Sequence, residues 1–381
     1  MPLRQSQFTI VQDDLTKAAD VDGGGDGREV PRNMNYTAEN FLTKDTGFTL
    51  AGDSTSDKSH SIFNYKKKKG TSYFIRANGT KLQIYNFFDR SWSDIVGSPT
   101  FTQDAEFGYV VYKDLLYLGN AVESMYTFDG ITFTEFASAP KGNIFEVFED
   151  RVFVTGVILQ PNTAYYSNVS IGTAFAVADV LNPLGTDNIT NLKNYYGTLL
   201  IFKRESIWKV TFEYRQDVSL FVPKLESQSG TYGACSRKAV AWVENDIWFF
   251  TGREVRSIGI TDNITGALGI NKSVISEPIK ETLNLIDNDN VNKIVVFYDS
   301  RRFYLGVPIT EDTIDTLFVC HTLYKNSWTK YVDRDKANVN DFVSIDDIIY
   351  SSSSTPPYGV IKWTVETEDT EDINNALTTE S

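Results

Sequence analysis

Short apolar segments alternate with polar turns along most of this 381-residue chain. The stretch from Gly142 to Phe175 shows the pattern most clearly. It holds an apolar strand, an acidic turn at Glu149-Asp150, a second strand RVFVTG, a polar loop around Pro161, a third strand TAYYSN and a short fourth strand. Apolar runs of this length, bounded by Asp, Asn and Gly, are typical of antiparallel strands joined by tight turns. The stretch therefore predicts one four-stranded sheet.

The same plan recurs along the chain, and its period can be counted. First strands are expected to begin near residues 60, 107, 143, 188, 237, 292 and 342. A spacing of about 45 residues with four short strands is the period of a β-propeller. Neither face of such a sheet is wholly polar, so each sheet needs a neighbour on both sides, and closure into a ring supplies it. We predict an all-β propeller of seven four-stranded blades, or six if the first or last unit is not a separate blade.

The last predicted unit lacks an outer strand, and a strand from the other terminus is expected to complete it. FTIV (Phe8 to Val11) and GFTLAG (Gly47 to Gly52) are the two candidates. Between them lies DVDGGGDGREVP, an acidic, glycine-filled segment that cannot bury enough surface to fold alone. We expect an N-terminal arm and closing strand over residues 1–58, the propeller over 59–365 and an acidic C-terminal tail over 366–381.

One helix is expected between the fifth and sixth units, where Ser276-Glu277-Pro278 is followed by IKETLNLI (Ile279 to Ile286). Ser276 is the predicted N-cap, Pro278 lies in the first turn, and Ile279, Leu283 and Ile286 fall on one face. The helix is expected to plug a blade edge, and a partner-docking element is the alternative.

Charge and composition narrow the classes of function. The net charge of −14 argues against gripping nucleic acid through its phosphates. Two cysteines, Cys235 and Cys320, and two histidines, His60 and His321, are too few for a disulfide framework or a metal cluster. Both cysteines are expected to be small buried residues in a reducing cytosol. The sequence has neither a signal-peptide pattern nor an apolar run of membrane-spanning length, so we expect synthesis in a cytoplasm.

No motif predicts an enzyme, a cofactor or a metal site, so no catalytic, cofactor-binding or metal-binding residue is assigned. The pairs Glu149-Asp150 and Asp346-Asp347 fall at turns, where acidic residues serve backbone geometry. DVDGGGDG superficially resembles a calcium loop, but Pro31 occupies the position that requires a bidentate Glu.

Two other charged segments have a structural interpretation. Asp287 and Asp289 belong to a loop without a nearby histidine in the sequence. The run Lys66 to Lys69 is interpreted as a solvated hairpin tip, or as a contact with an acidic neighbour such as another copy of the chain.

The order of several segments carries a resemblance. These are ENFLTKDTGFTL, EDRVFVTG with PNTAYYSN, NITNLKNYYGTLLIFKRESIWKV, SGTYGACSRKAVAWVENDIWFFTGREVRSIG, and RRFYLGVP with SWTKYV. In this order they resemble the β-propeller stabilisation or nozzle-type tail proteins of short-tailed phages. The resemblance spans about residues 38–365 and is strongest from Glu149 to Ile258.

The resemblance implies a structural virion protein, assembled in the host bacterial cytoplasm. It implies a homo-oligomeric ring, a hexamer, which contacts other tail proteins such as an adaptor and fibres or spikes. The ring extends the channel through which genomic DNA passes transiently and without specific binding. No contact with a membrane is implied. The C-terminal region of this chain is shorter than that of the family. A carbohydrate- or protein-binding propeller is the alternative, and a propeller glycosidase or lyase is a further one.

Overall fold

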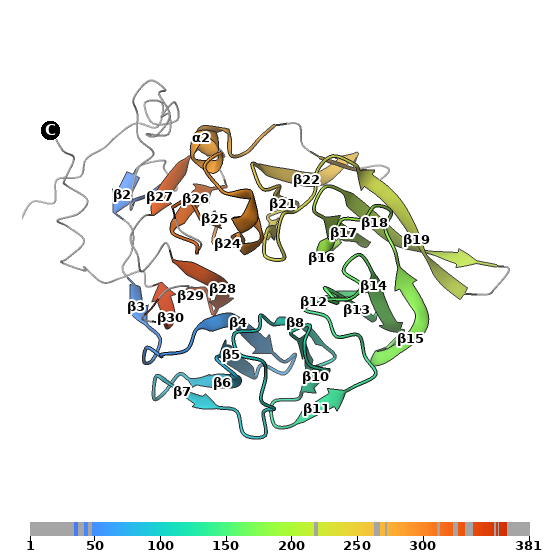
Figure 1. The fold of residues 1–381 in the computed structure, drawn as a ribbon, viewed down its shortest axis with the longest axis horizontal. Coiled ribbons are helices and arrows are strands. Elements are labelled where there is room, and N and C mark those ends of the chain that lie inside the picture. Colours follow the sequence, from blue (N-terminus) through green and yellow to red (C-terminus); the bar gives the residue numbers. More distant parts are fainter. Residues whose placement is uncertain are drawn as a thin grey trace, which may run out of the picture.

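The computed structural model describes residues 34–36, 42–44, 48–216, 220–262, 267–270, 273–310, 313–322, 327–331, 338–353, 356 and 358–363. Seven four-stranded antiparallel sheets stand as blades around a common axis, which makes the protein a seven-bladed β-propeller (Figure 1). The prediction of seven blades is confirmed, and the six-blade alternative is wrong. A separate two-stranded sheet pairs β1 (Met34–Tyr36) with β2 (Leu42–Lys44).

The first four blades follow the chain in order. Blade 1 contains β4 (Ser59–Lys66), β5 (Ser72–Asn78), β6 (Lys81–Asn86) and β7 (Ser91–Asp94), and blade 2 contains β8 (Gly108–Tyr112), β9 (Leu115–Gly119), β10 (Met125–Phe128) and β11 (Phe133–Phe136). Blade 3 contains β12 (Ile144–Phe148), β13 (Arg151–Thr155), β14 (Ala164–Asn168) and β15 (Ile171–Leu181), and blade 4 contains β16 (Ile189–Tyr195), β17 (Thr198–Lys203), β18 (Ile207–Arg215) and β19 (Leu220–Ser229).

The last three blades complete the ring. Blade 5 contains β20 (Val240–Val243), β21 (Asp246–Phe250), β22 (Val255–Asp262) and β23 (Ala267–Ile270), and blade 6 contains β24 (Val295–Asp299), β25 (Arg302–Val307), β26 (Thr316–His321) and β27 (Trp328–Tyr331). Blade 7 contains β28 (Val339–Ile345), β29 (Ile348–Ser353), β30 (Val360–Trp363) and β3 (Phe48–Leu50).

The N-terminal strand β3 closes the ring by supplying the outer strand of blade 7. Phe48 lies opposite Trp363, and Leu50 lies opposite Ile361. The indole Nε1 of Trp92 in blade 1 donates to the carbonyl of Ala51, 2.6 Å away, and ties the closing segment to the first blade as well. GFTLAG is therefore the closing segment. FTIV, the glycine-filled segment and the acidic tail lie outside the described residues.

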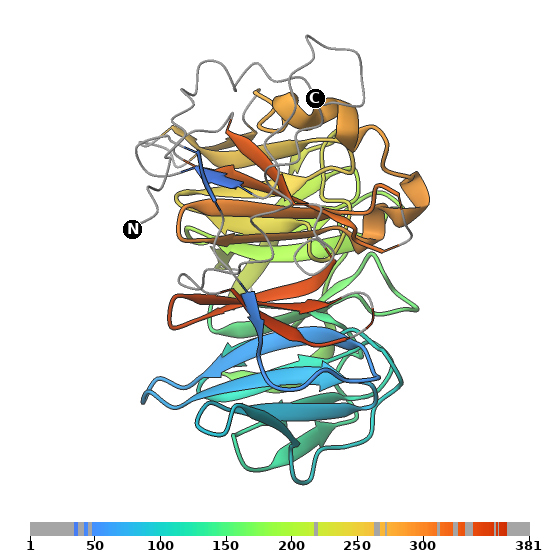
Figure 2. The ribbon, with the colours of Figure 1, turned by 90° about the vertical axis from the view of Figure 1, so that its left-hand side faces the viewer.

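The two ends of the ring differ in what they carry. We call the end at which the first strands begin the entry face, and the end that carries the turns between first and second strands the turn face. Figure 2 shows the short helices on one side and the tips of the blue and red first hairpins on the other. The helices thus lie on the entry face.

Tight turns on the turn face explain the acidic pairs. Both residues of four such turns have positive φ angles of 47–66°: Lys113-Asp114, Glu149-Asp150, Ser300-Arg301 and Asp346-Asp347. Two consecutive positive φ angles are the signature of the type I′ hairpin turn, which matches the twist of the flanking strands. The acidic pairs therefore serve backbone geometry, as predicted.

Three tyrosines join neighbouring blades at these turns. The hydroxyl groups donate to the backbone carbonyl of the second turn residue in the next blade: Tyr65 to Asp114, Tyr112 to Asp150 and Tyr195 to Asn245. Each tyrosine ends, or nearly ends, the first strand of its blade. The same position in blade 3 is Phe148, which has no hydroxyl group to donate.

The predicted helix is wrong in its length and its cap. A 3₁₀ turn η1 (Glu277–Ile279), one turn of α-helix α2 (Lys280–Leu283) and a second 3₁₀ helix η2 (Asn288–Lys293) replace it. The Ser276 hydroxyl caps neither, because it accepts a hydrogen bond from the backbone N–H of Val255 at 2.9 Å.

The burial that the helix pattern predicted is confirmed. Ile279, Leu283 and Ile286 are buried in one core with Phe250 of blade 5 and Phe303 of blade 6. The insertion therefore fills the junction between these two blades, as the plug interpretation predicted.

We expect Tyr195→Phe to lower the free energy of unfolding by about 1 kcal/mol, because it removes one buried hydrogen bond between blades. Tyr196→Phe is the matched control, since Tyr196 is exposed and its hydroxyl lies 3.4 Å from Asn245 Oδ1. Urea denaturation of both variants checks the expectation. Equal effects would show that the blade-to-blade hydrogen bond contributes nothing.

Candidate functional site

Two consecutive basic residues at the start of blade 5 reach across the propeller axis. Arg237 and Lys238 lie just before β20. The Arg237 guanidinium donates from Nη1 to the carbonyl of Phe107 at 2.7 Å and to that of Asn143 at 3.1 Å. Phe107 and Asn143 immediately precede the first strands of blades 2 and 3, so one side chain joins three blades.

Lys238 joins two further blades. Its ammonium group donates to the carbonyl of Asn340 in blade 7 at 2.7 Å and to that of His60 in blade 1 at 3.3 Å. Only 15% of its side chain is exposed. These carbonyl oxygens replace the hydration that the ammonium group loses on burial.

The backbone of the same two residues contacts the remaining blades. The Arg237 carbonyl accepts a hydrogen bond from Asn191 Nδ2 of blade 4, and the Lys238 carbonyl accepts one from Val296 N of blade 6 at 2.8 Å. The dipeptide is thus hydrogen-bonded to all six other blades.

Two carboxylates balance the two cations. Glu106 Oε2 lies 2.7 Å from Arg237 Nη2, and its other oxygen lies 3.8 Å from Lys238 Nζ. Asp341 Oδ2 lies 3.7 Å from Lys238 Nζ and accepts the backbone N–H of Ile62 at 3.2 Å. We call Glu106, Arg237, Lys238 and Asp341 the axial cluster.

The two carboxyl groups respond differently to the same cations. Burial disfavours the ionised form of Glu106, but the charges of Lys238 and Arg237 outweigh burial and lower its pKa to about 2. Water still reaches 45% of the Glu106 side chain. Burial raises the pKa of Asp341, and the same two cations offset this only in part.

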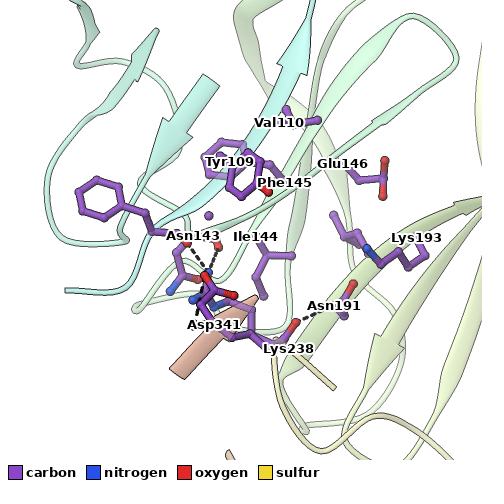
Figure 3. A pocket seen from close by; sticks show the side chains of 14 residues that line it. Tyr109, Val110, Asn143, Ile144, Phe145, Glu146, Asn191, Lys193, Lys238 and Asp341 are labelled. Atoms are coloured by element: carbon purple, nitrogen blue, oxygen red, sulfur yellow. Dashed lines mark hydrogen bonds and ion pairs between the residues drawn. The ribbon is translucent and has the colours of Figure 1, made fainter. Parts of the chain in front are cut away.

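The axial cluster divides the space along the axis. A cavity of about 320 Å³ lies among the first strands of blades 2, 3 and 4, with Lys238 and Asp341 toward one end and Glu146 and Lys193 toward the other (Figure 3). A cavity of about 700 Å³ opens at the loops that precede these strands. Arg237, Asn143 and Ile144 line both cavities, so Arg237 lies at the boundary between them.

Glu146 and Lys193 line the 320 Å³ cavity. Burial raises the pKa of Glu146, while the charge of the nearby Lys193 acts in the opposite direction. The larger cavity carries more varied groups, including Arg204, Asn188 and Asn292.

The two histidines lie in different blades. His60 is buried in blade 1, where Nδ1 donates to the carbonyl of Lys58 at 3.1 Å and Nε2 has no hydrogen-bond partner among the described residues. Burial lowers the pKa of His60 to about 4, so the ring is neutral at pH 7. His321 is buried in blade 6, and burial together with Arg302 lowers its pKa as well.

The two cysteines are free and buried, as predicted. Burial raises the pKa of the Cys235 thiol to about 12, which keeps it protonated at neutral pH. A protonated thiol is a poor nucleophile and a poor metal ligand.

The other charged residues that the sequence singled out lie apart from the axis. The run Lys66 to Lys69 forms the tip of the β4–β5 hairpin, as predicted. Asp287 caps η2 by accepting the backbone N–H of Asp289. Among the described residues, no three His, Cys, Asp or Glu side chains gather closely enough to hold a metal ion. The calcium-like segment from Asp20 lies outside the described residues.

The sequence did not predict the axial cluster. Its residues are separated by up to 235 positions, and no short motif contains them. One signal was available, because Glu106 directly precedes one expected first strand and Arg237 and Lys238 begin another, and first strands lie at the axis of a propeller. The dipeptide RK in front of AVAWV was the strongest form of that signal.

We expect Lys238→Met to lower the free energy of unfolding by about 3 kcal/mol, because it leaves Asp341 and two carbonyls without their buried cation and leaves Glu106 with Arg237 alone. Lys81→Met is the control, since the Lys81–Asp94 pair is exposed and should contribute less than about 1 kcal/mol. Urea denaturation at pH 7 measures both. Equal losses would contradict a special role of the axis.

Acidification should destabilise the fold through His60. The folded-state pKa of about 4 lies below the ordinary value of 6.5, so the unfolded chain binds a proton first. Stability therefore falls as the pH drops from about 6.5 to about 4, by about 3 kcal/mol at most. His60→Gln should lose this part of the pH dependence in urea denaturation at pH 7 and pH 4.5.

Two carboxyl groups add their own pH dependence. Glu106, with its lowered pKa, causes a further loss of stability between about pH 4.5 and pH 2. Asp341, with its raised pKa, acts in the opposite direction at pH values above about 3.8, which overlap the range of His60, so the comparison with His60→Gln isolates the contribution of the histidine. An unchanged slope between pH 7 and pH 4.5 in the His60→Gln variant would show that His60 does not cause it.

None of the helices in the described part of the chain has the length and apolar character that a membrane crossing requires. No protein-family model matches this chain, and no curated protein does.

Solved structures do resemble it in fold. The computationally designed Ika8 protein matches with a TM-score of 0.50 at 9% identity, over 84% of this chain and 100% of that one. An extracellular domain from B. thetaiotaomicron matches with a TM-score of 0.54 at 10% identity, over 84% of this chain but only 40% of that one. A chain of the mitotic checkpoint complex matches with a TM-score of 0.52 at 13% identity, over 87% of this chain and 99% of that one. At such low identities these likenesses concern the fold alone.

Proposed function

We propose that the chain is a structural protein of a phage tail, of the nozzle or stabilisation type. Copies of it assemble into a ring that extends the DNA channel and anchors fibres or spikes. The order of the segments quoted above supports the proposal, and a closed, stiff propeller is a suitable building block for such a ring.

The observation that carries the proposal is a series of exposed apolar side chains on the turn face. The hairpins between third and fourth strands of blades 1 to 4 each present one: Phe88 is 93% exposed, Ile131 80%, Ile171 54% and Phe221 62%. Repeated apolar tips on successive outer hairpins favour contacts with other proteins.

Blade 4 extends furthest as a two-stranded ribbon of β18 and β19 (Figure 1). Tyr214 and Phe221 lie opposite one another at its outer end, with ring centroids 5.3 Å apart. On the other face, Lys224 lies 2.7 Å from Glu213 and 2.9 Å from Glu226. An exposed two-stranded ribbon is marginally stable by itself, so an apolar end of this kind favours contact with a neighbour.

The contacts across the axis also bear on where DNA would pass. The axial cluster joins the blades across the centre of the single propeller, so we expect the DNA channel to form between copies. Walls of a chain with a net charge of −14 repel the phosphate backbone, which favours passage over binding. We expect the DNA-facing surface of the ring to be net negative.

We expect the wild-type chain to form rings in solution or on an adaptor, and Tyr214→Ser with Phe221→Ser to reduce ring formation by at least about tenfold, because both aromatic contacts are lost. Val96→Ser is the control, since Val96 is 90% exposed but lies in the loop after blade 1 on the entry face. Mass photometry and electron microscopy measure the assembly, and circular dichroism confirms the fold. A wild-type chain that stays monomeric under both conditions would contradict the proposal.

A binding module is the second candidate, and the 700 Å³ cavity on the entry face favours it. Amide side chains of Asn188 and Asn292, with Arg204 and Glu106, offer donors and acceptors that suit a polyhydroxylated ligand. Binding of an oligosaccharide to a stable monomer, lost in Asn292→Ala, would support this candidate over the ring.

A further inference from the structure

The tip of the β4–β5 hairpin concentrates positive charge. The side chains of Lys66, Lys68 and Lys69 are exposed and make no hydrogen bond or ion pair with any described residue. Lys67 differs, because its ammonium group lies 5.7 Å from the centroid of the Tyr65 ring and donates to the carbonyl of Asp129. We call Lys66 to Lys69 the lysine tip.

The acidic groups beside the lysine tip balance it only in part. Asp114 accepts the backbone N–H of Lys68 at 2.7 Å, and Asp129 lies in the neighbouring turn of blade 2. Two carboxylates thus face four lysines. Such an excess of positive charge favours an anionic partner.

The chain itself contains a segment of the opposite charge. Beyond Trp363 it continues for 18 residues with six carboxylates and without a lysine or arginine. The acidic residues are Glu366, Glu368, Asp369, Glu371, Asp372 and Glu380. We call residues 364–381 the acidic segment.

The fold delivers the start of the acidic segment close to the lysine tip. Third strands run from the entry face to the turn face, so β30 ends on the face that carries the lysine tip. Lys362 lies opposite Tyr350, whose ring lies 4.8 Å from that of Phe74 in blade 1. Phe74 in turn lies opposite Asn64, two residues before Lys66.

The length of the acidic segment is sufficient for this contact. Eighteen extended residues span about 60 Å, and Trp363 lies in blade 7, directly beside blade 1, which carries the hairpin. The chain can therefore reach the lysine tip without crossing the ring.

The other basic pair beside blade 7 is a poorer site. Arg301 and Arg302 belong to the first turn of blade 6, and Asp299 lies opposite Arg302 in the strand pair. Glu244 also acts on the charges around this turn. The positive charge of Arg301 and Arg302 is thus locally compensated, whereas that of the lysine tip is in excess.

We propose that the acidic segment of the same chain lies on the lysine tip and shields it from nucleic acid. Carboxylates of the segment take the place that phosphates would occupy. The contact prevents an otherwise acidic protein from presenting one adhesive basic patch to DNA. It does not depend on ring formation.

Carbodiimide crosslinking of the full chain tests the contact, with equal amounts of unlabelled and ¹⁵N-labelled protein. We expect amide crosslinks from Lys66, Lys68 or Lys69 to carboxylates of the acidic segment. Both peptides of each crosslink should carry the same isotope label, because the contact lies within one chain. The crosslinks should disappear at about 1 M salt, where the screening length falls to about 3 Å. Crosslinks between labels, crosslinks chiefly to Lys141 or Lys280, or none at all would overturn the proposal.

A binding measurement tests the shielding. With the six carboxylates of the acidic segment changed to amides, we expect single-stranded DNA to bind about tenfold more tightly than to wild type, with a logarithmic salt slope of about −2. Adding Lys66→Gln, Lys68→Gln and Lys69→Gln should abolish this gain.

The matched control combines the six amide substitutions with Lys141→Gln, Arg253→Gln and Lys280→Gln in place of the lysine-tip substitutions. These three residues are exposed and lie away from the hairpin, so this variant should keep the gain in DNA affinity. Unchanged DNA affinity after neutralising the acidic segment would overturn the shielding.

Discussion

The ring depends on charge held at its centre. A propeller closes through many similar apolar contacts between blades, and such contacts are non-directional. Arg237 and Lys238 add direction, because their donors meet carbonyls of particular residues and their own carbonyls accept from others. Every blade is thereby hydrogen-bonded to the same two residues. Buried cations of this kind tolerate little displacement, since a lost partner leaves an uncompensated charge.

The axial cluster also limits which groups are free to bind a ligand near the axis. Cavities lie on either side of Arg237, and the side chains of the axial cluster already form hydrogen bonds and ion pairs with other groups of the same chain. The exposed apolar side chains lie on the outer hairpins, and the larger cavity lies among the loops of the entry face. Such loops suit assembly and binding, because they can change without disturbing the sheets.

Most of the fold follows from local signals in the sequence. The strand period, the acidic turns and the closing segment are all local patterns, and type I′ turns such as Asp346-Asp347 fix the register of their hairpins. The axial cluster is different, since Glu106, Lys238 and Asp341 meet only after ring closure. The cap of the helix was predicted wrongly because the local sequence does not show that the Ser276 hydroxyl accepts the backbone N–H of Val255, 21 residues earlier.

The closing strand has a consequence for synthesis. Leu50 pairs with Ile361, about 310 residues later in the chain. A ribosome that adds about 5–20 residues per second leaves β3 waiting for roughly 15–60 s. During that time blade 7 is absent and blade 1 has no neighbour on that side, so the nascent chain exposes unpaired strand edges that can pair with other chains. The ring can therefore close only after β30 has been made, near the end of the described part of the chain.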